Sequence, residues 1–222
     1  MSDDGFGGVA IDTPPRACAL CVRLAAYRDA NRAANPGWFN APVPSFGPTH
    51  ARLLIVGMAP GLKGANRTGR PFTGDHAGEL LYRTLLRFRL ASGEYRADPA
   101  DGLTLHDCRI VNAVRCVPPA NLPESREIAA CNRFLAAELH ALPDVRIVLV
   151  LGVLAHAAVL KAYGIPAARI RFRHGATHTL PDGRLLANSY HVSRYNTSTR
   201  KLTTEMFEAV VAELRARLDG GS

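Results

Sequence analysis

Four short runs of apolar residues, each bounded by polar or turn-forming residues, stand out along the chain. They read RLLIVGM at 52–58, CRIVNAVR at 108–115, VRIVLVLGV at 145–153 and RLLANSYH at 184–191. Short runs of continuous apolar residues are typical of strands that are covered on both faces, as in a parallel sheet. The pattern therefore predicts four buried strands.

Between these runs, apolar residues recur at the spacing of a helix, as the leucines at 80, 81, 85 and 86 do. The predicted helices cover residues 17–33, 76–90, 124–142, a short stretch ending at Tyr163, and 203–218. Residues 1–13 are predicted to be a disordered tail, and 36–48 a loop rich in proline and aromatic residues. Strands that alternate with helices predict an α/β fold in which a mostly parallel sheet is the middle of three layers. We expect a single domain over residues 14–222.

The residues least expected in a core follow the ends of the predicted strands. Ligands of parallel α/β sheets bind at the carboxyl ends of the strands. The first strand leads into Gly57-Met-Ala-Pro-Gly61 and then into the loop GLKGANRTGRPFTGD at 61–75, which has four glycines, three cations, one aromatic residue and one closing acid. Asn112 lies near the end of the second strand and His191 at the end of the last one. The pattern therefore predicts a binding site at this edge of the sheet.

The amino-acid composition predicts a polyanionic binding partner. The chain of 222 residues carries 27 Lys and Arg against 19 Asp and Glu, a formal charge of +8 and a pI near 9.7. This balance favours binding to phosphates, and the dominance of Arg suits bidentate phosphate contacts. The longest apolar stretch, 147–154, is too short to span a bilayer, and the acidic, glycine-rich start does not resemble a signal peptide. We expect a cytoplasmic, nucleoid-associated protein without membrane contact.

Four of the five cysteines have the spacing of a metal centre. Cys18 and Cys21 form C-x-x-C at the start of a predicted helix, Cys116 follows a strand, and Cys131 lies in the next helix. In a cytosolic protein this pattern is usually a metal or redox site rather than a disulfide. Four thiolates from two distant segments can hold zinc or an iron–sulfur cluster, and spacing does not separate the two. Cys108 is interpreted as a buried apolar residue.

Several motifs together resemble one known family. GMAPG at 57–61, NRTGRPFTGD at 66–75, NAVRCVPP at 112–119 and SYHVSRYNTSTRKLT at 189–203 are similar to the iron–sulfur uracil-DNA glycosylases of family 5, as is the cysteine pattern. The resemblance spans about residues 14–215. It implies the three-layer fold of those enzymes, a monomer, and a [4Fe–4S] cluster held by Cys18, Cys21, Cys116 and Cys131. The implied reaction is base excision repair by a monofunctional DNA glycosylase, which removes uracil and other deaminated bases such as hypoxanthine and xanthine.

The resemblance also implies which carboxylate serves catalysis. The related family 4 has glutamate after the first glycine of this motif, but Met58 stands there in this chain, as in family 5. In the family 5 pattern the functional acid closes the long loop, and that residue is Asp75. A carboxylate near C1′ stabilises the cation that forms as the glycosidic bond breaks. The alternative for Asp75 is a helix N-cap, and both roles can hold together.

Three further side chains have implied roles, each beside a structural alternative. Phe72 stacks on the extruded base, or fills the core beneath the loop. Asn112 reads the base edge with its amide, or caps a strand end. His191 donates to the departing uracil O2, or is a satisfied histidine at a strand end, which is also our interpretation of His156.

The remaining predicted contacts are with the substrate backbone. Gly57, Met58, Ala59 and Gly61 would approach the nucleotide closely. DNA-backbone contacts are expected from Lys63, Asn66, Arg67, Arg70, Ser193, Arg194 and Tyr195. Arg194 or Tyr195 would fill the gap left in the base stack. Arg173 and His174, in the sequence RFRHG, add to the basic character without an assigned role.

Two other functions compete with the enzyme. A metal-stapled module that binds nucleic acid without chemistry would use the same cations and cysteines. A nucleotide-binding enzyme with GMAPG as its phosphate loop is disfavoured, because the chain has neither G-x-x-x-x-G-K-[ST] nor G-x-G-x-x-G in this segment.

Overall fold

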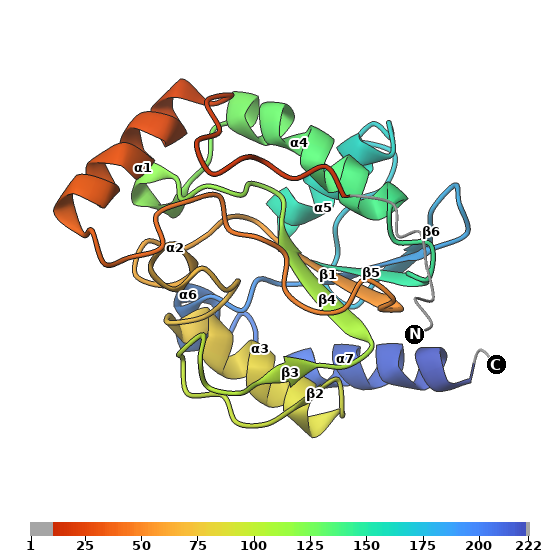
Figure 1. Ribbon diagram of the computed structural model, residues 1–222. Coiled ribbons are helices and arrows are strands. Elements are labelled where there is room, and N and C mark those ends of the chain that lie inside the picture. The colour runs from red at the N-terminus through yellow and green to blue at the C-terminus, as the bar shows by residue number, and fades with distance from the viewer. Residues whose placement is uncertain (1–10, 221–222) are drawn as a thin grey trace, which may run out of the picture.

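The structure, a computed structural model, describes residues 11–220 and is built on a five-stranded sheet in the order β4-β1-β5-β7-β6 (Figure 1). The strands are β1 (Leu53–Gly57), β4 (Cys108–Asn112), β5 (Ile147–Leu151), β6 (Thr177–Thr179) and β7 (Leu185–Ser189). All neighbours are parallel except β6, which runs antiparallel to β7 at the edge. The register pairs Gly57 with Asn112 and Leu151 with Ser189, so the carboxyl ends of the parallel strands meet at one edge.

Helices cover both faces of this sheet. On one face lie α1 (Val22–Ala34), α4 (Ser125–His140) and α5 (Val153–Ala162), and on the other α3 (His76–Arg87) and α7 (Thr204–Asp219), as Figure 1 shows. The predicted three-layer arrangement and the mostly parallel sheet are confirmed.

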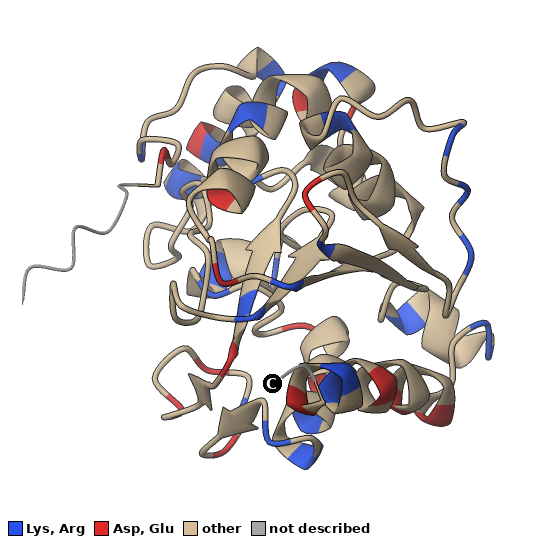
Figure 2. Cartoon of the chain, turned by 90° about the vertical axis from the view of Figure 1, so that its right-hand side faces the viewer, with Lys and Arg blue, Asp and Glu red and all other residues tan. Residues whose placement is uncertain are grey.

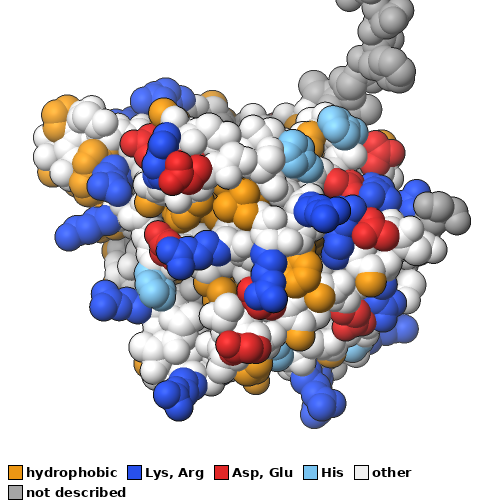
Figure 3. Space-filling view, turned by 90° about the horizontal axis from the view of Figure 1, so that it is seen from below, with side chains coloured by type: hydrophobic (Ala, Val, Ile, Leu, Met, Phe, Trp, Pro, Cys, Tyr) orange, Lys and Arg blue, Asp and Glu red, His pale blue; other side chains and the backbone are white. Residues whose placement is uncertain are grey.

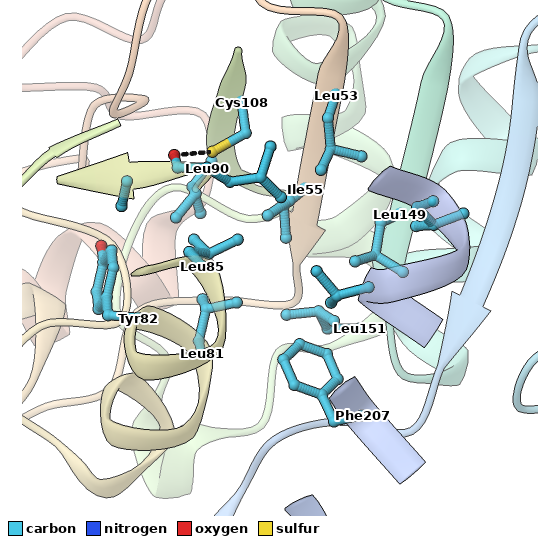
Figure 4. Packing of buried hydrophobic residues seen from close by; sticks show 14 of the residues in the cluster. Leu53, Ile55, Leu81, Tyr82, Leu85, Leu90, Cys108, Leu149, Leu151 and Phe207 are labelled. Carbon is cyan, nitrogen blue, oxygen red and sulfur yellow. Dashed lines mark hydrogen bonds between the residues drawn. The ribbon is translucent and has the colours of Figure 1, made fainter. Parts of the chain in front are cut away.

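Side chains of each strand alternate between two cores. Leu53 and Ile55 of β1 pack toward α3 and α7 with Leu81, Leu85 and Phe207 (Figure 4), whereas Leu54 and Val56 pack toward α4 and α5. Every residue of β1 and β5 is buried, which explains why these strands read as continuous apolar runs. Cys108 is fully buried and its thiol donates to the Leu90 carbonyl at 3.2 Å, which fits its interpretation as a core residue.

The structure differs from the sequence prediction mainly in short elements. The predicted loops contain two helices, α2 (Ala65–Thr68) and α6 (Arg194–Ser198), and a 3₁₀ turn, η1 (Pro119–Asn121). Two-residue strands β2 (Ala91–Ser92) and β3 (Thr104–Leu105) form a separate ribbon. The missed edge strand β6 has three residues, none of them buried, so the pattern contains no apolar run to detect. The first helix begins five residues later than predicted, because Cys21 occupies its N-cap position.

Of the predicted disordered tail, residues 1–10 lie outside the described residues. Ile11 packs against the core on the α4 and α5 side, and Asp12 lies 3.5 Å from Arg133. Within residues 11–220, no helix is both long enough and apolar enough to cross a membrane.

Candidate active site

A cavity of about 460 Å³ opens at the carboxyl ends of the parallel strands. It lies where the sequence pattern predicted a site, at the strand ends of an α/β sheet. Asp75, just before α3, and His191, just after β7, are far apart in the sequence, and both line this cavity. The other predicted residues on its wall are Met58, Ala59, Gly61, Phe72, Asn112, Ser193 and Arg194.

Asp75 caps helix α3 and faces the cavity. Its Oδ1 accepts a hydrogen bond from the Ala77 N–H at 3.1 Å, so the N-cap alternative is confirmed. The carboxylate lies close against the loop backbone: a Cβ on Gly61 would come within 2.6 Å of Oδ2, and one on Gly64 would overlap it. Burial raises the pKa of Asp75, while the N–H groups of Ala77 and Gly78 oppose that shift. The result is a partly desolvated carboxylate with a fixed direction.

Phe72 and Asn112 meet above Gly57. The Phe72 side chain is 7% exposed and packs in the core, and it also lines the cavity. Its position is therefore compatible with both predicted roles, filling the core and stacking on a base. A Cβ on Gly57 would lie 2.5 Å from Phe72 Cζ and would overlap Asn112 Oδ1, so only glycine fits. Asn112 Oδ1 is buried and has no hydrogen-bond partner among the described residues. A buried acceptor without a partner is unfavourable by about 1–3 kcal/mol, so this oxygen is free to accept from a ligand.

His191 follows β7 and lines the same cavity as Asp75. Its ring centroid is 6.1 Å from that of Phe72, and its backbone carbonyl accepts from Asn196 Nδ2 at 2.8 Å. Gly152, at φ +97°, lies directly against it, since a Cβ there would be 3.2 Å from His191 Cβ. Burial lowers the pKa of His191 from 6.5 to about 4. The imidazole is therefore neutral at physiological pH and still has one N–H to donate.

Two residues predicted to contact DNA are buried instead. Arg70 is 5% exposed, forms a bidentate ion pair with Asp101 at 2.7 Å, and lies over the rings of Tyr82 and Tyr95. Asn66 is fully buried and donates from Nδ2 to Asn40 Oδ1 at 2.9 Å. The prediction was wrong for both, because these side chains hold the long loop on the core rather than facing solvent.

The other predicted backbone contacts are accessible. Lys63, Arg67, Arg194 and Tyr195 are exposed, Tyr195 to 72%. Ser193 is the N-cap of α6, where its Oγ accepts from the Asn196 N–H at 3.4 Å.

Sequence reasoning missed two polar residues on the cavity wall, His76 and Asn121. A ring nitrogen of His76 lies 3.1 Å from Thr197 Oγ1, which joins the start of α3 to α6. Asn121, at φ +55°, accepts from the Leu62 N–H at 3.3 Å. The sequence offered little to find them: His76 is next to Asp75, and Asn121 comes shortly after Pro118-Pro119.

The four predicted ligand cysteines line one small cavity of about 10 Å³ between α1, α4 and the end of β4. Two donors point at their sulfurs: Arg28 Nη1 lies 3.7 Å from Cys116 Sγ, and the Arg115 N–H lies 3.4 Å from Cys131 Sγ. Burial raises the pKa of Cys116 to about 11 and of Cys131 to about 12. Four sulfurs on one cavity fit a thiolate-ligated centre, in which the thiols lose their protons on metal binding. However, no three Cys, His, Asp or Glu side chains within residues 11–220 are arranged to hold a metal ion.

Comparisons with known proteins agree with this geometry. The family model of the uracil DNA glycosylase superfamily matches residues 44–215. The type-5 uracil-DNA glycosylase of Thermus thermophilus is 47% identical over 92% of this chain and 94% of its own length. That of Mycobacterium leprae is 39% identical over 89% and 90%, and a type-4 enzyme of Saccharolobus solfataricus is 29% identical over 79% and 77%. The resemblance is confirmed, and the chain belongs to the uracil-DNA glycosylase superfamily, a family of DNA glycosylases.

Proposed function

We propose that this protein is a monofunctional uracil-DNA glycosylase of base excision repair, which hydrolyses the N-glycosidic bond and leaves an abasic site. The observation that carries the proposal is the shared cavity in which Asp75 faces His191, with Phe72 and Asn112 on its wall. An extruded nucleotide would fit there with its sugar toward Asp75 and its base toward His191. None of the three lysines, Lys63, Lys161 and Lys201, lines the cavity, which argues against a Schiff-base intermediate and strand cleavage.

Asp75 acts on the sugar. As the bond breaks, positive charge develops at C1′, and a carboxylate held beside it lowers the barrier. The N-cap hydrogen bond and the close backbone of Gly61 and Gly64 fix the carboxylate before the substrate arrives. The same carboxylate can orient the attacking water.

His191 acts on the leaving group. Negative charge builds on O2 of the departing base, and a neutral imidazole N–H aimed at that oxygen stabilises it. Its low pKa supports the neutral form over the imidazolium.

Phe72 and Asn112 recognise the base. The unpaired Asn112 Oδ1 suits an N–H of the base edge, and the Phe72 ring offers a stacking face. We extend the substrates to hypoxanthine and xanthine, because a cavity of about 460 Å³ has room for a purine. Gly57, Met58, Ala59 and Gly61 bring backbone, rather than a second carboxylate, to the nucleotide.

Lys63, Arg67, Ser193 and Arg194 contact the flanking phosphates. Tyr195, the most exposed large aromatic side chain of the described residues, fills the space of the extruded nucleotide. The protein works as a monomer in the cytoplasm, at the nucleoid.

Cys18, Cys21, Cys116 and Cys131 hold a [4Fe–4S] cluster. Bound there, it supplies a structural link and no step of the reaction. The thiols come from the start of α1, the end of β4 and helix α4, so the cluster fastens the first helix to the sheet. Purified protein should be brown, with a broad band at about 400 nm. Colourless protein with one zinc would refute iron and keep the fastening role.

The activity is tested with purified protein and duplexes that contain uracil, hypoxanthine, xanthine or thymine opposite each base. Uracil opposite guanine should yield alkali-labile abasic sites. Asp75→Ala should lower the single-turnover rate by roughly a hundredfold or more, as loss of a key electrostatic group does. A near-normal rate would reject the role of Asp75. Tight binding without release of any of these bases would favour the non-catalytic module.

A further inference from the structure

Most arginines of this protein have a carboxylate, carbonyl or ring partner. Within the described residues, six arginine side chains have none: Arg89, Arg169, Arg171, Arg173, Arg194 and Arg200. Five of these six lie in two segments, 169–173 and 194–200, which flank Tyr190 and His191 in the sequence. By contrast, on the face in Figure 3 Lys and Arg lie among Asp and Glu. Exposed arginines of α3 are paired, as Arg83 is with Glu79 and Arg87 with Glu208. The unpaired charge is therefore concentrated in two segments, one on each side of His191 in the sequence.

Residues 169–174, RIRFRH, form what we call the arginine strap. Arg169, Arg171 and Arg173 are exposed, whereas Ile170, Phe172 and His174 between them are partly buried. This period of two is that of an extended chain with one outer face. The strap, with the residues around it from 167 to 175, contains no acidic residue. An extended loop at the right-hand edge of Figure 2 shows Lys and Arg recurring in this way.

The inner face of the strap is anchored. The Phe172 ring lies 5.7 Å from that of His156, and the Ile170 carbonyl accepts from His156 Nε2 at 2.9 Å. His174 stacks on Tyr190 with ring centroids 4.9 Å apart and an interplanar angle of 11°, and its Nδ1 accepts from the Tyr190 N–H at 3.1 Å. A row of charges that served only solubility would not need a backbone held by rings and hydrogen bonds.

These anchors connect the strap to the active site. Tyr190 directly precedes His191, and Lys201 Nζ lies 5.2 Å from the Tyr190 ring centroid. After the strap, the Gly175 N–H donates to the Asn188 carbonyl at 2.8 Å, close to the carboxyl end of β7. The Arg173 end of the strap is therefore at the cavity edge of the sheet.

The spacing suits a phosphate backbone. Arg169 closes a turn, whereas residues 171–173 do not turn, so Arg171 and Arg173 are about 7 Å apart at about 3.3 Å per residue. One strand of B-DNA carries one phosphate per about 3.4 Å of helix axis, so two guanidinium groups at this separation can each meet a different phosphate. Guanidinium groups bind phosphate oxygens through paired N–H donors.

We propose that the arginine strap is a second DNA-backbone contact, which binds phosphates of the DNA flanking the excised nucleotide, apart from the contact at Ser193–Tyr195. The inference rests on the proposed function, because it takes DNA as the substrate. The strap adds affinity and salt dependence, and leaves the bond-breaking step to Asp75 and His191.

The test compares the variant R169Q/R171Q/R173Q with wild type. Binding is measured by fluorescence anisotropy over a range of salt concentrations. The probe is a duplex that extends a full helical turn on both sides of 2′-fluoro-2′-deoxyuridine, which resists hydrolysis. Each lost phosphate contact lowers the slope of log K against log salt by about 0.9, so we expect a decrease of roughly 2 to 3 and binding weaker by tenfold or more. The single-turnover rate at saturating enzyme should not change.

Two controls separate location from net charge. R96Q/R133Q/R217Q removes the same charge from exposed, ion-paired arginines elsewhere and should keep the wild-type slope. R169K/R171K/R173K should restore most of the salt dependence. A strap variant with the wild-type slope, or with no greater loss than the first control, would overturn the proposal. Failure of the proposed function would appear separately, as no base release by wild type.

Discussion

The active-site cavity and the cysteine cavity both shift the pKa of their buried ionisable groups toward the neutral form, but they differ in the space that they leave. In the larger cavity burial raises the pKa of Asp75 and lowers that of His191 to about 4, and in the smaller one it raises the thiol pKa of Cys116 to about 11 and of Cys131 to about 12. Every shift favours the neutral form. The larger cavity, however, has about 460 Å³ of space in front of its groups, and the smaller one about 10 Å³. Desolvation next to open space suits groups that meet a substrate, whereas the smaller cavity has no room for one.

The cysteine cavity should therefore control stability, and this is the largest effect we expect. If the proposed cluster is bound, Cys131→Ser should lose iron and lower the free energy of unfolding by several kcal/mol, because metal binding contributes directly to folding. Thermal unfolding and iron content measure both. Cys108→Ser, at a buried cysteine outside the cavity, is the matched control and should keep its iron. Equal iron content in the two variants would remove the distinction between the cysteines.

The active-site cavity should instead control rate with little effect on stability. Gly64→Ala places a methyl group on Asp75 Oδ2 and displaces the carboxylate. A misplacement of a catalytic group by about 1 Å can lower the rate by roughly a hundredfold, and we expect a loss of this order. Gly37→Ala, where a Cβ would meet nothing within 4 Å, is the control. Single-turnover uracil release at wild-type speed in Gly64→Ala would show that the position of Asp75 is not critical.

Replacing Asn112 should raise stability and lower the rate of uracil release. Asn112→Leu removes a buried oxygen without a partner, so we expect a gain of about 1 kcal/mol in stability. Uracil release should fall by up to roughly tenfold, the worth of one hydrogen bond to the base. Chemical denaturation measures the change in stability, and the uracil release assay measures the change in rate. A variant that is less stable and equally active would mean that Asn112 serves the fold.

The pH dependence is the smallest effect. In the proposed mechanism Asp75 acts as a carboxylate, and its raised pKa means that, as pH falls, activity should be lost at a higher pH than for an exposed aspartate. His191, with a pKa of about 4, stays neutral above that pH. Single-turnover rates should be flat from roughly pH 6 to 8, where an ordinary histidine titrates. Activity lost on raising the pH through 6.5 would identify a charged imidazole.

Local sequence explains part of the long loop after β1. Asp75 was predictable as a helix cap because the leucine stripe of α3 starts just after it. Lys63 and Arg67 were predicted to contact the DNA backbone, and both are exposed. Arg70 is of the same residue type in the same loop, yet it pairs with Asp101, which is 31 residues away. No pattern within the loop distinguishes Arg70 from Arg67, because the difference lies in which distant partner the fold brings near.

The sequence alone was enough to predict the four parallel strands, the long helices, the edge of the sheet at which a site would form, and the family, because residue periodicity and short motifs are local properties. The tertiary structure decided the rest. It placed Asp75 and His191 on one cavity, buried Asn66 and Arg70, added His76 and Asn121 to the wall, and left the strap arginines unpaired. Burial, pKa and charge pairing depend on neighbours far away in the chain, and only the folded packing supplies those neighbours.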